Sequence, residues 1–223
     1  MINIAIDGPA GAGKSTISRY AAQKLGLIYV DTGALYRAIG LFALQRGGDA
    51  YNRDLIVGLL PSIDVDLRHV NGEQRVYLCG ENVTQIIRTP EVSLAASAVA
   101  EVTAVRNHLF NLQLEIARKN DVIMDGRDIG TVILPHATLK IFLTASAEER
   151  ARRRHNELLE RGQDVDYDDV LSDVITRDHA DSSRAIAPLR PAHDAVIVDT
   201  TGLNFEEAAD KVISLIRQRT GLR

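Results

Sequence analysis

Short apolar runs alternate with longer stretches of helical pattern along most of this 223-residue chain. The apolar runs predict buried strands at Ile2–Ile6, Leu27–Val30, Val122–Met124, Leu139–Leu143 and Ala195–Val198. Helices are predicted over Lys14–Leu25, Gly33–Arg46, about Glu91–Arg118 and Phe205–Arg219. Because strands that alternate with helices form parallel sheets through crossover connections, the pattern predicts an α/β fold.

One region departs from this alternation. Ile63–Leu67 and Arg75–Leu78 each alternate apolar and polar residues, and Asn71-Gly72 lies between them. Asn-Gly between alternating segments is a strong signal for a β-hairpin. We therefore expect an antiparallel insert at about residues 61–89.

The first predicted strand leads into a glycine-rich segment that fits the pattern G-x-x-x-x-G-K-S/T of phosphate-binding loops. Glycines let backbone N–H groups approach phosphate oxygens, and the following helix adds its positive N-terminal end. Lys14 supplies a charge for the β and γ phosphates, and the Ser15 hydroxyl can reach Mg²⁺. The residues expected to hold the triphosphate are Gly8, Pro9, Ala10, Gly11, Ala12, Gly13, Lys14, Ser15 and Thr16.

The alternative interpretation of this segment is a glycine-rich turn with an exposed lysine. A strand is predicted before the segment and a helix after it, which is the context that the motif requires. We therefore expect the loop to bind a nucleoside triphosphate.

Composition argues against several other classes of protein. The net charge of −4, with six Tyr, four Phe and no Trp, is not typical of nucleic-acid binding. No uncharged apolar stretch reaches the roughly 18 residues of a membrane span, and no signal peptide is recognised. Cys79 is the only cysteine, so we expect a reducing, cytoplasmic location, with this residue in a buried or half-buried strand.

The loop alone leaves the class of nucleotide-binding protein open. A GTPase would carry N-K-x-D after a D-x-x-G switch, but Asp199–Gly202 lies near the C-terminus with no such motif after it. An ATP-hydrolysing switch is a competing class, since Val122–Asp125 partly matches a strand that ends in an acidic residue. Arginines near predicted strand ends favour a small kinase, because Arg suits phosphate, although a single Arg–Asp pair is more often a surface ion pair.

Five segments together resemble the bacterial type of the cytidylate kinase family: GPAGAGKST, DTGALYR, DGRDIGTV, RDHADSSR and APL, with Ala96-Ser97 and Arg106 between the second and third. The resemblance covers nearly the whole chain. It implies a P-loop kinase core with a five-stranded parallel sheet flanked by helices, a small antiparallel insert in the monophosphate-binding region and a short helical lid. The implied single domain, 1–223, has its core at 1–60, 106–150 and 170–223, its insert at about 61–105 and its lid at about 151–169.

The resemblance also implies an activity, the transfer of the γ-phosphoryl group of ATP to CMP, and to dCMP, giving CDP or dCDP and ADP. Mg²⁺ would be carried by ATP and held at Ser15. Because the acceptor phosphate is already largely dianionic at neutral pH, no catalytic base is needed. The expected partners of a monomeric protein are ATP and CMP or dCMP, with no nucleic acid and no membrane. Another P-loop kinase of nucleotides or small molecules is the alternative, alongside the ATP-hydrolysing switch.

The family pattern assigns roles to individual residues. The implied catalytic residues are Lys14, Arg127, Arg184, Arg152 and Arg154. The implied CMP-binding residues are Thr32, Tyr36, Arg37, Ser97, Arg106, Asp125, Arg127, Asp128, Arg177, Asp181 and Arg184. Within this set the acceptor phosphate would contact Arg37, Arg127 and Arg184. The ribose would contact Arg177 and Asp181, and the base would contact Ser97, Arg106 and Asp128.

The helix around Arg150–Arg154 has two interpretations. The resemblance implies a mobile lid whose closure brings arginines onto the phosphates and excludes water. The alternative is a solvated helical face, on which Glu148, Glu149, Glu157 and Glu160 pair with the arginines at helical spacing. The resemblance favours the lid.

Overall fold

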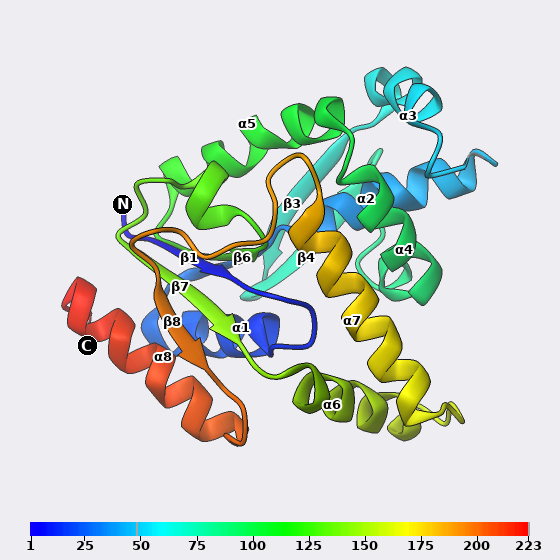
Figure 1. The fold of residues 1–223 in the computed structure, drawn as a ribbon. Coiled ribbons are helices and arrows are strands. Elements are labelled where there is room, and N and C mark those ends of the chain that lie inside the picture. Colours follow the sequence, from blue (N-terminus) through cyan, green and yellow to red (C-terminus); the bar gives the residue numbers. More distant parts are fainter. Residues whose placement is uncertain (48, 223) are drawn as a thin grey trace. The chain divides into compact units, whose positions relative to one another are not determined.

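The computed structural model describes residues 1–47 and 49–222, which form two compact units (Figure 1). The first unit contains Met1 and Ile28–Asp121. The second contains Ile2–Leu27 and the chain from Val122 onward. Among the described residues, none of the helices combines the length and the hydrophobicity that a membrane span requires.

The predicted parallel sheet is confirmed. Its five strands lie in the order β2-β6-β1-β7-β8. Their bounds are β1 Asn3–Asp7, β2 Ile28–Asp31, β6 Val122–Gly126, β7 Leu139–Thr144 and β8 Val196–Asp199. In the second unit β1 pairs in parallel with both β6 and β7, with Ile4 opposite Ile123 and Leu139. The continuous run Ile4-Ala5-Ile6 is fully buried, as expected for a parallel strand covered on both faces.

Four α-helices complete the second unit: α1 Lys14–Leu25, α6 Ala147–Glu160, α7 Tyr167–Ser183 and α8 Phe205–Thr220. A short π-helical turn, η3, spans Ile129–Ile133. Helix α1 packs against α8, and α6 packs against α7 (Figure 1). Part of the α6–α7 contact is apolar, since Ala151, Leu158 and Val170 form a small buried cluster there. Tertiary packing of this kind adds to the stability of both helices.

The first unit holds the antiparallel insert. Its strands are β3 Val65–Val70, β4 Glu73–Leu78 and β5 Glu81–Asn82, paired in the order β3-β4-β5. The predicted hairpin turn is confirmed, because Asn71 and Gly72 both have positive φ, 54° and 79°, as a type I′ turn requires. The third strand, β5, was not predicted, because two exposed polar residues carry no strand signal.

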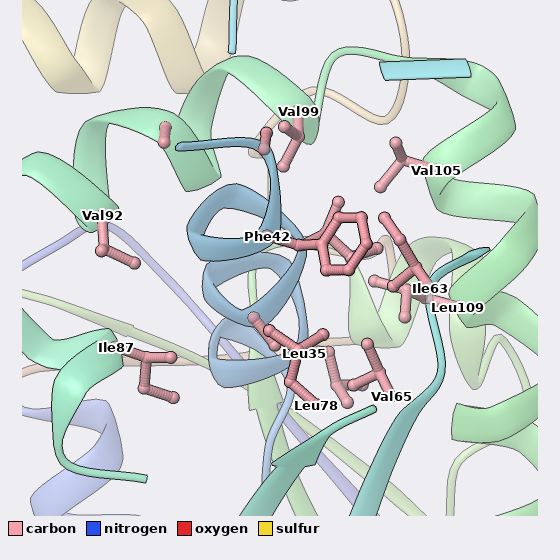
Figure 2. Close-up of a cluster of buried hydrophobic side chains, with 14 of the residues drawn as sticks. Leu35, Phe42, Ile63, Val65, Leu78, Ile87, Val92, Val99, Val105 and Leu109 are labelled. Carbon is pink, nitrogen blue, oxygen red and sulfur yellow. The ribbon is translucent and has the colours of Figure 1, made fainter. Parts of the chain in front are cut away.

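The helices of the first unit are α2 Gly33–Gln45, α3 Arg53–Leu59, α4 Pro90–Val99 and α5 Thr103–Lys119, with short 3₁₀ turns η1 Leu60–Ser62 and η2 Ile86–Arg88. Their apolar faces share one core with the hairpin. Figure 2 shows Leu35 and Phe42 of α2 among side chains that include Val65 and Leu78 of the hairpin and Leu109 of α5. The side chains that pack in this core come from segments that are distant in sequence, so tertiary contacts fix the positions of these helices.

Two predictions in this unit are wrong. The single helix predicted over about 91–118 is two helices, α4 and α5, because the chain leaves helical geometry at Val102 and buries that side chain. No glycine or proline marks this break, so no breaker signal announced it. Cys79 is exposed and lies in the turn after β4 with φ of 49°, not in a buried strand. The turn places its backbone N–H 2.7 Å from the carbonyl oxygen of Asp64.

Helices α2 and α4 pack closely at Gly40, so we expect a larger residue at this position to destabilise the fold. A Cβ on Gly40 would lie 3.0 Å from both the Ala95 Cβ and the Ala96 backbone nitrogen. We expect Gly40→Ala to lower the free energy of unfolding by about 1–3 kcal/mol, because the two helices would have to separate.

Gly58 of α3 supplies the matched control, since a Cβ added there would have nothing within 4 Å of it. Gly58→Ala should raise the free energy of unfolding by about 0.5–1 kcal/mol through better helix propensity. Urea denaturation of both variants tests the pair. Equal effects of the two substitutions would contradict the close-packing explanation.

Candidate active site

The glycine-rich loop lies between β1, which ends at Asp7, and α1, which begins at Lys14. Gly8 has φ of 150°, and a Cβ there would lie 1.9 Å from the Leu143 carbonyl oxygen on β7. Only glycine can occupy this position. Gly11 and Gly13 also have positive φ, 77° and 86°. The strand, loop and helix therefore follow one another as the phosphate-binding motif requires.

Lys14 is buried within this loop. Its Nζ donates a hydrogen bond to the Pro9 carbonyl oxygen at 2.7 Å. Burial, and then the charge of Arg127, hold the pKa of Lys14 well below its usual range, while nearby carboxylates, chiefly Asp125, act in the opposite direction. The alternative interpretation, an exposed lysine on a surface turn, is wrong. An additional negative group near Lys14, beyond these carboxylates, would favour the charged form of the lysine.

A hydroxyl and a carboxylate meet beside the loop. The Ser15 Oγ donates to Asp125 Oδ2 at 2.8 Å, and Asp125 lies buried near the carboxyl end of β6. Both groups are hard oxygen donors of the kind that Mg²⁺ prefers. The family pattern assigns Asp125 to CMP, whereas in the structure its carboxylate contacts the phosphate loop. Among the described residues no set of three or more His, Cys, Asp or Glu is arranged to hold a metal by itself.

The second unit also brings together five residues that were predicted to bind CMP: Arg127, Asp128, Arg177, Asp181 and Arg184. Arg127 Nε lies 2.7 Å from Asp181 Oδ2, and Arg184 lies 3.6 Å from Asp128. Burial acts to raise the pKa of Asp181, but the hydrogen bond and charge of Arg127, with the charges of Arg177 and Arg184, hold it below the usual value. The cluster is thus an arginine-rich group balanced by two carboxylates.

Buried Arg150 and half-buried Asp178 form an ion pair that the sequence interpretation missed. Arg150 lies on α6 and makes two hydrogen bonds to the Asp178 carboxylate on α7, at 2.9 and 2.5 Å. Arg150 also donates to the Ala10 carbonyl oxygen of the phosphate loop at 3.1 Å. Asp178 belongs to the RDHADSSR segment, but no role was predicted for it. No local pattern signals this pair, because the two residues are 28 positions apart in the sequence.

The other arginines of α6 differ in their surroundings. Arg152 pairs with Glu149, and Arg154 pairs with Glu157 at 3.2 Å. Their side chains are 59% and 39% exposed. Arg153 pairs with Glu149 as well, at 2.8 Å, and also donates to the Thr200 carbonyl oxygen at 2.8 Å, which ties α6 to the turn after β8. Two of the glutamates that the solvated-face interpretation named therefore pair with arginines in this structure.

Asp31 organises the predicted residues of the first unit. Its carboxylate lies 3.5 Å from Arg37 and 3.9 Å from Arg88, and it accepts from the Ala34 N–H at the start of α2 at 3.0 Å. The Gln74 side chain bonds both backbone groups of Asp31, with Oε1 2.8 Å from the N–H and Nε2 3.3 Å from the carbonyl oxygen. Asp31, Arg88 and Gln74 were not predicted as site residues.

Other residues predicted for the monophosphate site lie on the helices of the first unit. Thr32 is buried at the N-cap position of α2. The guanidinium of Arg106 is buried and lies 5.8 Å from the centre of the Tyr36 ring. The Ser97 hydroxyl donates to the Ser93 carbonyl oxygen at 3.3 Å. A second side chain of the hairpin, after Gln74, contacts β2, since His69 Nε2 lies 2.9 Å from the Tyr29 carbonyl oxygen.

Known proteins resemble this chain in sequence over nearly its full length. The family model for cytidylate kinase matches residues 4–218. A cytidylate kinase from Caldicellulosiruptor bescii is 54% identical over 96% of this chain and 95% of its own length. One from Bacillus subtilis is 44% identical over 98% of each chain. The solved structure of an uncharacterised protein from Eubacterium ventriosum, at 14% identity and a TM-score of 0.55, covers 98% of this chain and 100% of its own. That structure shares the fold alone.

Proposed function

The chain belongs to the cytidylate kinase family, and from this membership we infer that it transfers the γ-phosphoryl group of ATP to CMP, giving CDP and ADP. The observation that carries the proposal is the match to this family across residues 4–218. We extend the proposal to dCMP as a second acceptor. The two alternatives, another small-molecule kinase and an ATP-hydrolysing switch, are not favoured.

Phosphoryl transfer to CMP requires neither a covalent intermediate on the protein nor a catalytic base. The acceptor phosphate has a second pKa of about 6, so it is already a nucleophile at neutral pH. The difficulty lies in bringing two polyanions together and in stabilising the charge on the transferred group. Buried Lys14 and the cluster of Arg127 and Arg184 are suited to this task, because cations in a site with little water act strongly on a developing charge.

The Ser15–Asp125 pair fits the Mg²⁺ that accompanies ATP. We propose that both oxygens hold Mg²⁺ when the nucleotide binds, since Mg²⁺ usually takes one or two protein oxygens and completes its shell with phosphates and water. The ion would neutralise charge on the β and γ phosphates. The Ser15 hydrogen bond keeps the Asp125 carboxylate beside the loop, where this ion is needed.

We assign the acceptor as the family pattern does, except that we place Asp125 at the Mg²⁺ site instead of at CMP. Arg37, Arg127 and Arg184 would contact its phosphate, and Arg177 and Asp181 its ribose. Thr32 and Tyr36 would line the pocket, and Ser97, Arg106 and Asp128 would contact the base. Arg152 and Arg154, on the lid at about 151–169, would reach the phosphates when the lid closes.

We further propose a cytoplasmic protein that acts as a monomer, with an acceptor region at about 61–105 and no nucleic-acid or membrane partner. The negative net charge supports the absence of a nucleic-acid partner. Analytical ultracentrifugation with and without CMP would test the oligomeric state.

A coupled assay of ADP release tests the function. We expect rapid ADP formation with ATP and CMP or dCMP and little with AMP or GMP. Formation with UMP should be slower, because cytosine offers a 4-amino group to a carboxylate where uracil has a carbonyl. ADP release without any monophosphate would point to a hydrolytic switch. As a control, Lys14→Ala should remain folded and lose transfer, since Lys14 supplies the side-chain charge of the phosphate loop.

Asp128→Asn tests recognition of the base. If Asp128 accepts from the 4-amino group, the preference for CMP over UMP, as a ratio of kcat/KM values, should fall by about tenfold or more, mainly through loss of CMP activity. The structure supplies the competing role, because Asp128 lies 3.6 Å from Arg184. A residue that only holds Arg184 would lower both kcat/KM values by the same factor and leave their ratio unchanged.

The lid assignment predicts a contrast within α6. Because Arg152 and Arg154 are exposed, Arg152→Gln with Arg154→Gln should lower kcat by about tenfold or more while Tm changes little. Arg153→Gln should lower Tm, because it breaks the contact with Thr200. Unchanged turnover in the double variant would leave the solvated face as the correct interpretation.

A further inference from the structure

Asp7 is a buried carboxylate at the end of the central strand β1. Asp7 is only 4% exposed, so a polar residue is buried directly after three apolar residues that are themselves fully buried. Oδ1 accepts the Ile129 N–H at 2.8 Å, and Oδ2 accepts the Gly130 N–H at 2.7 Å. One side chain thus satisfies two consecutive backbone amides from a segment 122 and 123 residues further along the chain.

The segment that Asp7 holds is the one that carries two proposed acceptor contacts. Ile129 and Gly130 directly follow Arg127 and Asp128 and open the η3 turn. The first amides of a helical turn have no partner within it, so they need an external acceptor. The Asp128 carbonyl oxygen accepts from the Val132 N–H at 2.8 Å, which closes the turn on its other side. The backbone at Arg127 and Asp128 is therefore fixed by the turn, and the turn is fixed by Asp7.

The chemistry of the contact requires a carboxylate and a glycine. Burial raises the pKa of Asp7 to about 6, and the charge of Asp128 adds to the rise. The Gly130 and Ile129 amides and the charge of Lys14 oppose it. A Cβ on Gly130 would lie 3.3 Å from Asp7 Oδ2 and 3.2 Å from Lys140 Cδ, so a side chain there would crowd the contact. An ionised carboxylate accepts both amides, whereas an asparagine would place its own N–H₂ against one of them.

We propose that Asp7 is a positioning residue for the acceptor, which fixes the backbone of residues 127–130 so that Arg127 and Asp128 meet CMP in the orientation that transfer requires. This role rests on the proposed function. Asp7 is also the residue before Gly8, so one side chain links the start of the phosphate loop to the acceptor segment. A residue needed only for packing would be apolar here, because an ionised group is costly to bury.

Asp7→Asn tests the proposal with two independent readouts. Amide hydrogen exchange should show loss of protection at Ile129 and Gly130 without any substrate present. In steady-state kinetics the KM for CMP should rise by about tenfold while the KM for ATP stays within about twofold, because the variant disturbs the acceptor segment and leaves the loop glycines in place. Ser18→Ala is the control, and it should change neither the exchange at Ile129 and Gly130 nor the two KM values. Ser18 of α1 is fully buried, and its hydroxyl has no hydrogen-bond partner within the described part of the chain.

The outcomes separate the role of Asp7 from the function itself. Equal rises in both KM values, or unchanged exchange at Ile129 and Gly130, would overturn the positioning role. Wild-type protein that fails to phosphorylate CMP would count against the proposed function, and the exchange data would still report on the contact. If Asp7→Asn does not fold, Gly130→Ala crowds the same carboxylate from the other side and should give a smaller rise in the KM for CMP alone.

Discussion

Burial of ionisable side chains near the carboxyl ends of the strands is the constraint on which the rest of the molecule depends. In the second unit Asp7, Lys14 and Asp125 are 4%, 7% and 2% exposed. A charge is retained without water only when backbone amides, hydroxyls or opposite charges replace the lost hydration. The loop geometry, the η3 turn and the Ser15 hydrogen bond supply these partners. These side chains of the second unit are therefore held in place by the protein itself, which is what the proposed function requires of them.

Much of the fold could be predicted because its elements carry local signals. The strands are short apolar runs, and Gly26 ends α1 in the left-handed conformation that favours glycine. The hairpin follows from Asn71-Gly72, whose positive φ values only a few residue types tolerate. The break between α4 and α5 had no such signal. Burial of Val102 and the contacts of its neighbours decide that geometry, and these are tertiary effects.

The site could be predicted only as far as motifs name residue types. The phosphate loop was recognised because its glycines and Lys14 follow a fixed spacing. The supporting partners were missed because they lie far away in sequence: Asp178 is 28 residues from Arg150, and Gln74 is 43 residues from Asp31. The motif around Asp125 predicts an acceptor ligand, and only the fold reveals that its carboxylate bonds Ser15. Pairings of this kind depend on topology, which no local pattern encodes.

The hairpin has a consequence for solubility as well as for the site. Strand β2 is at one end of the sheet order, so its outer backbone groups could pair with a strand of another molecule. Gln74 bonds the N–H and carbonyl oxygen of Asp31, and His69 lies within hydrogen-bond distance of the Tyr29 carbonyl oxygen. These side chains occupy the positions that an added strand would need. The insert thus protects the edge of β2 against pairing with another molecule, although it adds no strand there.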